Sequence, residues 1–333
     1  MAKRPRVALI ITGGTIDSIG ADRLDLAWYI EAGKRLDTGG LLAQIPEVEQ
    51  IAEVTEVPFR RLPSHALVDK DWLDLVRTID QIFSEDQADG VVVTHGTNTL
   101  EETAYFLSLT VKSDRPVVVV GAMRPSNALS ADGPLNLLNA IRVAGDPASR
   151  GQGALVVLND TVLAGRDVTK TATYRVDTFQ GRDLGPLGYA DADGSIVYYH
   201  RTTRPHTLDT EFDVRELQSL PRVDVVVSYV GADGAMIDAA VKAGAKGIVS
   251  GGTGAGRPTP LEDEAFTRAH EAGVVICQAS RVGSGRSVRS PSLVRRGFVA
   301  SGNLQPWKAR LLLALALTKT TDPVEIQRIF DTY

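Results

Sequence analysis

Short runs of β-branched residues alternate along this chain with longer stretches of helical periodicity, and this alternation restricts the possible folds more than any other feature. Runs such as Val117 to Val120 have no polar face, so helices must cover the strands that they form on both sides. We expect strands at 6–12, 90–94, 116–121, 154–158, 223–230, 247–250 and 274–277. The sequence therefore predicts an α/β fold with a largely parallel sheet.

Two segments favour helices. Apolar side chains recur every three or four residues from Trp72 to Phe83, and Asp69 or Asp71 provides an acidic start. The run from Leu311 to Leu317 is apolar throughout, but its seven residues are too few to cross a membrane. We expect it to form a packed helix.

The length of 333 residues favours two domains, since a single hydrophobic core rarely grows so large. The alternation lapses in a polar, proline-containing stretch and restarts near Arg222. We predict an N-terminal domain at 1–190, a linker at 191–213 and a C-terminal domain at 214–333.

Composition argues against several classes of protein. The chain has 36 Lys and Arg against 41 Asp and Glu, and a net charge of -5 does not suit a nucleic-acid partner. The apolar run before Thr12 is too short for a signal peptide or a membrane anchor, so we predict a cytoplasmic protein with no membrane partner. Cys277, the single cysteine, lies in an apolar run and is expected to be a buried core residue.

Two familiar kinds of site do not fit. In the glycine-rich run 251–258, Arg257 and Pro258 stand where a phosphate loop needs Lys and Ser or Thr, which favours a tight turn after a strand. The five histidines and one cysteine include no pair at helical metal spacing, so we expect no metal.

Hydroxyl-bearing turns follow two of the expected strands. Gly13 and Gly14 allow close backbone approach and place Thr15 just beyond a strand end, although a plain turn with Thr15 as a helix cap fits equally well. A similar turn at 94–103 places Thr97 at a helix N-terminus. A third loop supplies Lys170, which is either a solvated charge or, in a dry site, a proton acceptor.

Several motifs in the same order resemble those of the bacterial L-asparaginase family of asparaginases and glutaminases. They are 12–16, 94–104, 120–125, 159–171, 185–189 and 297–302, and the resemblance covers essentially the whole chain. It implies a larger, catalytic N-terminal domain with a mixed, mostly parallel sheet and a smaller flavodoxin-like C-terminal domain. It also implies a cofactor-free homo-oligomer, usually a tetramer, in which a neighbouring subunit completes each site.

The resemblance also implies roles for individual residues. Thr15 matches the nucleophile, Thr97 the second catalytic threonine and Lys170 the lysine that serves it. Tyr29 falls where a mobile loop supplies a tyrosine that helps to activate the nucleophile. The implied reaction is hydrolysis of a small carboxamide, by default L-asparagine: threonine attack, loss of ammonia, then attack of water on the acyl-enzyme.

Other positions match residues that contact the substrate. Ser64 matches the serine that holds the substrate carboxylate, and Ala122 the residue whose carbonyl contacts the scissile amide. Gly14, His65 and Asn98 belong to the same loops. These five residues complete the predicted site.

The chain departs from the family pattern where the α-ammonium of the substrate would bind. Asn98 replaces an aspartate and His65 a glutamine, and 282–291 has arginines near the position of a neighbour's glutamate. We therefore hypothesise a substrate without a free α-ammonium, such as an N-acylated asparagine or glutamine, an ω-amide or a cyclic amide. Its second polar group would meet one of three arginines, which are Arg257, Arg286 and Arg289.

Other interpretations stay open. The Asn98 oxygen would still accept a hydrogen bond from an ammonium group in an ordinary but weaker asparaginase, or Asn98 marks a variant engineered to trap its ligand. A weakly catalytic amide sensor and a nucleotide-dependent enzyme are further alternatives. A neutral Asn98 would also make Lys170 easier to deprotonate than a carboxylate would.

Overall fold

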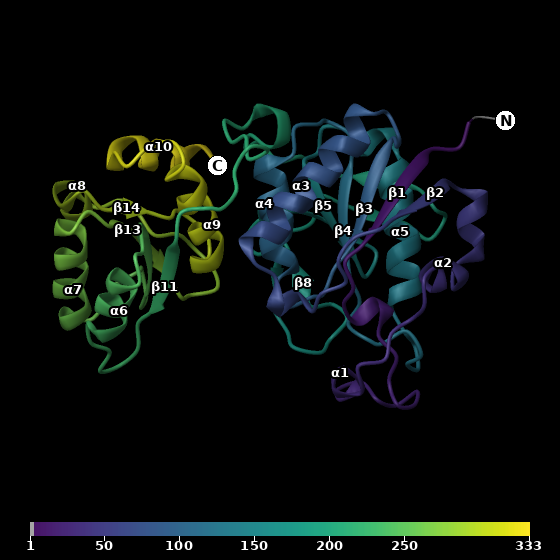
Figure 1. Ribbon diagram of the computed structural model, residues 1–333, viewed down its shortest axis with the longest axis horizontal. Coiled ribbons are helices and arrows are strands. Elements are labelled where there is room, and N and C mark those ends of the chain that lie inside the picture. The colour runs from purple at the N-terminus through teal and green to yellow at the C-terminus, as the bar shows by residue number, and fades with distance from the viewer. Residues whose placement is uncertain (1–2) are drawn as a thin grey trace. The chain divides into compact units, whose positions relative to one another are not determined.

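Two sheets organise residues 3–333, the part of the chain that the computed structural model describes (Figure 1). The larger sheet belongs to a unit that ends at Glu216, and the smaller one to a unit from Leu217 to Tyr333. The predicted class, two α/β units with a mixed, mostly parallel sheet in the first, is confirmed.

The larger sheet has eight strands in the order β10-β9-β6-β5-β4-β3-β1-β2. Strands β2, β1, β3, β4 and β5 are parallel, and β6, β9 and β10 continue the sheet in antiparallel pairs. The hairpin of β7 and β8 lies outside it. The bounds are β1 Arg6–Ile11, β2 Glu53–Val57, β3 Gly90–Thr94, β4 Val117–Val120, β5 Ala154–Leu158, β6 Thr161–Ala164, β7 Thr169–Lys170, β8 Phe179–Gln180, β9 Gly188–Ala190 and β10 Ile196–Tyr198.

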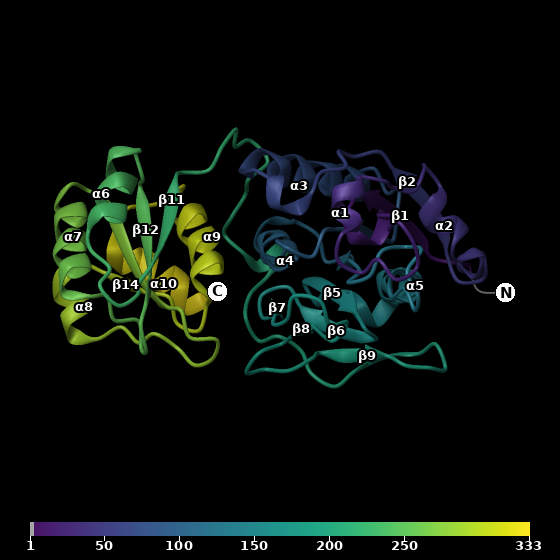
Figure 2. The ribbon, with the colours of Figure 1, turned by 90° about the horizontal axis from the view of Figure 1, so that it is seen from below.

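Helices cover both faces of this sheet, as the apolar strands require (Figure 2). Helix α5 packs on one face and α4 on the other, where α3 lies against α4. The β4 strand is completely buried between them. The helices of this unit are α1 Tyr29–Ala32, α2 Gly40–Ala43, α3 Asp69–Ser84, α4 Leu100–Thr110 and α5 Gly133–Gly145; the 3-10 turns are η1 Thr15–Asp17, η2 Pro46–Gln50, η3 Ser64–Ala66, η4 Pro147–Ser149 and η5 Thr207–Asp209.

The smaller sheet is parallel throughout, in the order β11-β12-β13-β14. Helices α6 and α7 pack on one face and α9 on the other (Figure 2). The expected apolar run lies in α9 apart from its last residue, Leu317, which caps the helix. Cys277 is buried in β13. The bounds are β11 Val223–Val227, β12 Gly247–Gly252, β13 Val275–Ser280, β14 Val299–Ala300, α6 Ala235–Lys242, α7 Pro260–Glu271, α8 Pro291–Arg296, α9 Pro306–Ala316 and α10 Pro323–Thr332.

Two expectations about local structure change. The strand expected at 223–230 ends at Val227, and Val230 is 99% exposed, because the chain turns away from the sheet after Ser228. The stretch 191–213, expected as a linker, contains β10, which pairs with β9 in the larger sheet. Lys112 Nζ also donates hydrogen bonds to the carbonyls of Thr207 and Thr210, so this stretch packs on the first unit.

The glycine-rich run after β12 forms a tight turn. Thr253 and Arg257 pair across it through two backbone hydrogen bonds of 2.8 Å. In the part of the chain from residue 3 onward, we find no helix with the length and apolarity that a membrane span needs.

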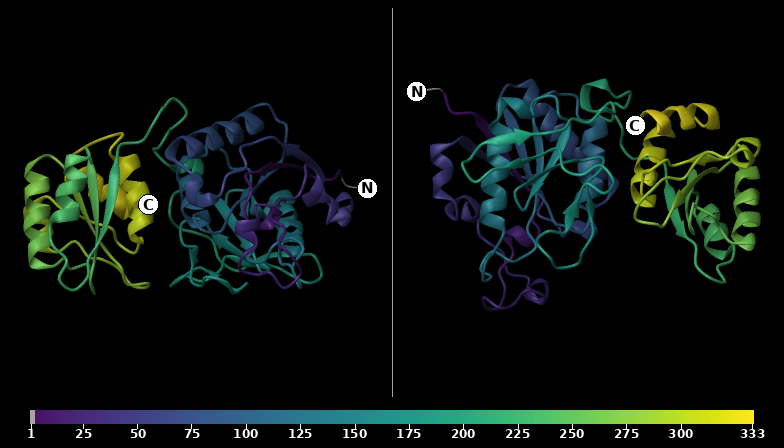
Figure 3. Two further views of the ribbon diagram at one scale, coloured as in Figure 1. Left: turned by 60° about the horizontal axis from the view of Figure 1, so that its bottom comes forward. Right: turned by 180° about the vertical axis from the view of Figure 1, so that it is seen from behind.

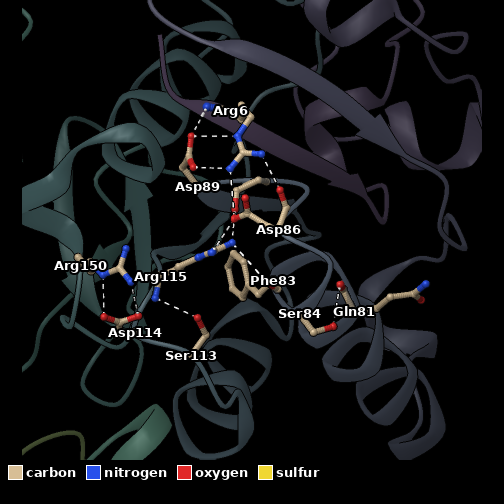
Figure 4. Close-up of polar contacts among 11 residues, drawn as sticks. Arg6, Gln81, Phe83, Ser84, Asp86, Asp89, Ser113, Asp114, Arg115 and Arg150 are labelled. Carbon is tan, nitrogen blue, oxygen red and sulfur yellow. Dashed lines mark hydrogen bonds and ion pairs between the residues drawn. The ribbon is translucent and has the colours of Figure 1, made fainter. Parts of the chain in front are cut away.

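An ion-pair network lies where four parallel strands begin (Figure 4). Arg6, at the start of β1, contacts Asp89 at 2.8 Å and Asp86 at 3.3 Å. Arg115, just before β4, contacts Asp86 at 2.7 Å, and a separate pair joins Arg150 to Asp114 at 2.6 Å before β5. The hydrogen bonds from the arginines hold the pKa values of Asp86 and Asp89 below their usual range. The network ties the amino ends of the strands together.

Asp89→Asn is expected to lower the melting temperature at pH 7 by at most about 2–4 °C, because Asp89 is partly exposed and water screens its ion pairs. A carboxylate with a depressed pKa stabilises the fold above its unfolded-state pKa and loses that effect as pH falls through its folded-state pKa. Thermal unfolding should therefore show the difference at pH 7 and little of it near pH 2. Glu264→Gln, at an exposed carboxylate, is the control; an equal loss in both variants would contradict the prediction.

Candidate active site

The carboxyl ends of β1 and β3 bring the two threonine turns into contact. The strands are neighbours in register, with Ile11 opposite Thr94. Gly14, with φ 115°, turns the chain so that Thr15 opens the short helix η1. A methyl group at Gly14 would lie 2.6 Å from the Cα and the amide nitrogen of Gly96, so the two backbones touch there. This contact requires glycine at position 14.

Thr15 shares a hydrogen bond with the tyrosine of the following loop. The Thr15 Oγ1 and Tyr29 Oη atoms are 2.9 Å apart. Tyr29 is only 7% exposed, whereas its neighbours Trp28 and Ile30 are 72% and 64% exposed. Burial raises the pKa of Tyr29, so its phenol keeps its proton at neutral pH.

The Tyr29 loop is closed at its base. Ser18 and Arg35 pair as an isolated antiparallel bridge, and Arg35 Nη1 lies 3.8 Å from the buried Asp17 Oδ2. Beyond this base, the segment containing α1 projects past the end of the sheet (Figures 1 and 3). The structure therefore holds Tyr29 on a protruding loop whose two ends are fixed.

Thr97 is paired with Lys170. The Lys170 Nζ atom donates a hydrogen bond of 2.9 Å to Thr97 Oγ1. Lys170 is partly buried on β7, and burial lowers the pKa of its ammonium group while the nearby Glu101 carboxylate raises it. Lys170 is therefore a better proton acceptor than an exposed lysine.

Glu101 supports this pair, although the sequence did not identify it as a site residue. Its carboxylate accepts a hydrogen bond from the Thr169 hydroxyl, and its other oxygen lies 3.5 Å from the Lys170 backbone nitrogen. The available signal was an acidic residue in the first turn of α4, where a helix N-terminus favours negative charge.

A buried chain of hydrogen bonds holds the backbone before Thr97. His95 Nδ1 lies 2.7 Å from the Gly96 carbonyl oxygen and His95 Nε2 lies 2.8 Å from Thr103 Oγ1, which accepts from Trp72 Nε1. Burial lowers the pKa of His95 to about 4. The neutral ring therefore donates from Nδ1, since a carbonyl can only accept. His95 has a structural role at this turn.

The loop after β4 forms the third wall. Asp132 accepts hydrogen bonds of 2.9 Å from the backbone nitrogens of Met123 and Arg124. Asn136 donates to the Gly121 carbonyl at 3.1 Å and accepts from the Asn159 backbone nitrogen at 2.8 Å. These contacts fix Ala122, which is fully buried between Gly121 and Met123.

The same loop adjoins the second threonine. A methyl group at Gly121 would lie 3.1 Å from Thr97 Cγ2. The side chains of Asp132 and Asn136 were not identified from the sequence, because hydrogen bonds between a helix and a distant loop leave no local pattern.

Ser64 presents a buried hydroxyl to the site. Its Oγ forms no hydrogen bond with any residue that the structure describes, and a methyl group at Gly96 would lie 2.6 Å from it. Its carbonyl accepts a 2.8 Å hydrogen bond from Thr99 Oγ1. A buried hydroxyl without a protein partner suits a ligand-binding role.

The first unit thus places most of the predicted site residues on loops that contact one another. His65 and Asn98 are both exposed, beside Ser64 and Thr97 respectively. The residues that the loops bring together are Gly14, Thr15, Tyr29, Ser64, Thr97, Ala122 and Lys170.

The arginines considered as ligands for a second polar group belong to the second unit. Arg257 and Arg286 are exposed in the single chain, and Arg289 is partly buried. Across residues 3–333, no three His, Cys, Asp or Glu side chains gather into a group suited to a metal ion.

Comparisons with known proteins agree with this architecture. Residues 6–204 match the family described as "Asparaginase, N-terminal", and residues 222–330 match "Glutaminase/Asparaginase C-terminal domain". L-asparaginase 2 of Escherichia coli (strain K12) is 46% identical over 331 residues, which cover 99% of this chain and 93% of that protein. Glutaminase-asparaginase of Pseudomonas aeruginosa is 38% identical over 335 residues, with coverage of 99% and 91%.

A solved structure supports the same relation. The probable cytoplasmic L-asparaginase from Campylobacter jejuni matches with a TM-score of 0.95 at 40% identity, covering 99% of this chain and all of that one. Fold, site and relatives together define a hydrolase that acts on amides. The chain belongs to the asparaginase family, and the predicted resemblance is confirmed.

Gly14→Ala is expected to reduce activity at least about 100-fold and to lower stability, because the methyl group would collide with the Gly96 backbone and separate Thr15 from Thr97. Steady-state kinetics and thermal unfolding measure both effects. Gly151→Ala is the matched control, since Gly151 also has positive φ but has open space at its Cβ position. Similar activity losses in the two variants would show that φ alone matters.

Proposed function

We propose that this protein hydrolyses the side-chain amide of L-asparagine to L-aspartate and ammonia, with Thr15 as the nucleophile. The observation that carries the proposal is the pair of hydroxyl contacts on touching loops: Thr15 to Tyr29, and Thr97 to Lys170, each at 2.9 Å. A threonine hydroxyl is a weak nucleophile, and it needs neighbouring groups that move its proton.

The first half-reaction transfers the acyl group to Thr15. Thr15 Oγ1 attacks the amide carbon while its proton moves to Tyr29 Oη, and Tyr29 passes its own proton to the leaving nitrogen. The C–O bond to Thr15 forms, the C–N bond breaks and ammonia leaves. Because Tyr29 has a raised pKa, it acts as a relay that remains a phenol and is not a stored phenolate.

The second half-reaction releases the acid. A water molecule attacks the ester carbon and gives a proton through Thr97 to neutral Lys170. The ester bond to Thr15 then breaks as Lys170 returns this proton through Thr97 to the Thr15 oxygen, which restores neutral Lys170 and the Thr15 hydroxyl. Burial favours the neutral form of Lys170 that this step requires. We assign the Ser64 hydroxyl, which has no hydrogen-bond partner among the described residues, to the substrate carboxylate, and the Ala122 carbonyl to the scissile amide.

Thr15→Ala is expected to lower the rate of ammonia release from L-asparagine by at least about 1,000-fold, and Tyr29→Phe by about 100-fold or more. A coupled ammonia assay on folded variants measures both. Thr332→Ala and Tyr199→Phe, at partly or fully exposed positions, are the matched controls. Full activity of Thr15→Ala would refute the nucleophile. If the wild-type protein binds amides but releases no ammonia, it is a sensor.

A second candidate substrate is an amide without a free α-ammonium. Asn98 is an exposed neutral amide at the turn that carries Thr97, while the neighbouring Glu101 carboxylate is buried and engaged with Thr169 and Lys170. Position 98 of this turn therefore has no carboxylate that could bind the ammonium group of a substrate. N-acylated asparagine or succinamate would not need one.

Asn98→Asp is expected to raise kcat/KM for L-asparagine about tenfold, because a charge-assisted hydrogen bond is stronger than a neutral one by roughly 1.4 kcal/mol. The measurement is a panel of L-Asn, L-Gln, D-Asn, succinamate and N-acetyl-asparagine with both proteins. Asn98→Leu, of similar size, controls for simple disruption. A wild-type preference for the last two substrates, reversed in Asn98→Asp, would replace L-asparagine by the second candidate.

Assembly and location follow from the resemblance alone. We propose a homotetramer in which a neighbouring subunit completes each site, and a cytoplasmic location. The names of relatives differ on location, since one is a probable cytoplasmic L-asparaginase and another, from Haemophilus influenzae, is a probable periplasmic L-asparaginase.

A further inference from the structure

Glu101 is a buried carboxylate that the reaction described above does not use. It is 7% exposed and lies in the first turn of α4, four residues after Thr97. A buried carboxylate is unfavourable unless hydrogen bonds and opposite charge compensate for its lost hydration. The identity of its partners therefore indicates its role.

Both carboxylate oxygens of Glu101 face β7. One accepts a hydrogen bond from the Thr169 hydroxyl, and the other lies 3.5 Å from the Lys170 backbone nitrogen. Because Thr97 precedes α4 and Lys170 lies on β7, Glu101 connects the two segments whose side chains meet at Thr97 Oγ1. The carboxylate is thus placed to set where the Lys170 amine lies.

Of the two cations described near Glu101, Lys170 is the one that contacts a predicted site residue, Thr97. Glu101 interacts electrostatically with Lys170 and with Arg182. Arg182 also interacts with Asp167 and Asp183, so its charge is shared among several acids. The carboxylate that interacts with Lys170 is Glu101, and its charge raises the pKa of Lys170 against the effect of burial.

We propose that Glu101 is a positioning residue for Lys170. The Glu101 carboxylate holds the β7 backbone through Thr169, and its negative charge attracts the Lys170 amine, so that the amine faces Thr97. This inference rests on the proposed function and deepens it. The Glu101 carboxylate contacts Thr169 and the Lys170 backbone, so it acts on the reaction through Lys170.

The test is the pH dependence of kcat in Glu101→Gln, which keeps the shape of the side chain and removes its charge. Without the negative charge, the neutral form of Lys170 persists to lower pH. The acidic limb of the kcat profile should therefore move down by about 1 pH unit, while the maximal rate falls because the Thr169 and Lys170 contacts weaken.

Two variants separate charge from geometry. Thr169→Val removes the hydrogen bond to Glu101 and keeps the Glu101 charge. The maximal kcat should therefore fall while the acidic limb of the pH profile stays in place. Glu101→Asp keeps the charge on a shorter side chain and should restore the position of the limb but not the full rate. Glu102→Gln, at the next carboxylate of the same helix turn, is the matched control and should leave the limb in place.

Two outcomes overturn the inference: a limb that stays fixed in Glu101→Gln, or one that moves equally in Glu102→Gln. The proposed function fails separately, if Thr15→Ala keeps its activity. If Thr15→Ala loses activity but the acidic limb of the kcat profile does not move in Glu101→Gln, the role of Glu101 is rejected and the proposed function stands.

Discussion

The site depends on one contact between two backbones, Gly14 against Gly96. Parallel pairing of β1 with β3 brings the two turns to the same edge of the sheet, but register alone leaves room for side chains between them. Only because neither glycine has a side chain do the turns touch. The position of Thr15 relative to Thr97 is consequently set by main chain, which is stiffer than packing between flexible side chains.

Burial then gives the paired groups their chemical character. The same loss of hydration raises the pKa of Tyr29 and lowers that of Lys170, so both are favoured as neutral groups. A neutral phenol can donate a proton and a neutral amine can accept one, so these forms are suited to proton transfer. Glu101 opposes this trend at Lys170, and the balance between burial and carboxylate decides how readily the amine accepts a proton.

The sequence predicted those parts of the molecule whose cause is local. The uniform apolar run of β4 and the helical spacing of α3 are repeated signals within one segment, and both elements formed as expected. The strands β9 and β10 are three residues each and owe their existence to the sheet edge they join, so no periodicity marks them. Of the site, the threonine turns were visible as motifs. Glu101 and Asn136 act through contacts with distant loops, which a single sequence does not encode as a pattern.

The ion-pair network and the hydroxyl pairs lie at opposite ends of the same parallel strands. Arg6 and Asp89 are at the beginnings of β1 and β3, and the turns with Thr15 and Thr97 follow the ends of these strands. Changes at distant sites without shared partners usually add independently. The far end of this sheet is therefore a region where heat resistance can be engineered with little disturbance of the chemistry, and where natural variation can accumulate without changing the substrate.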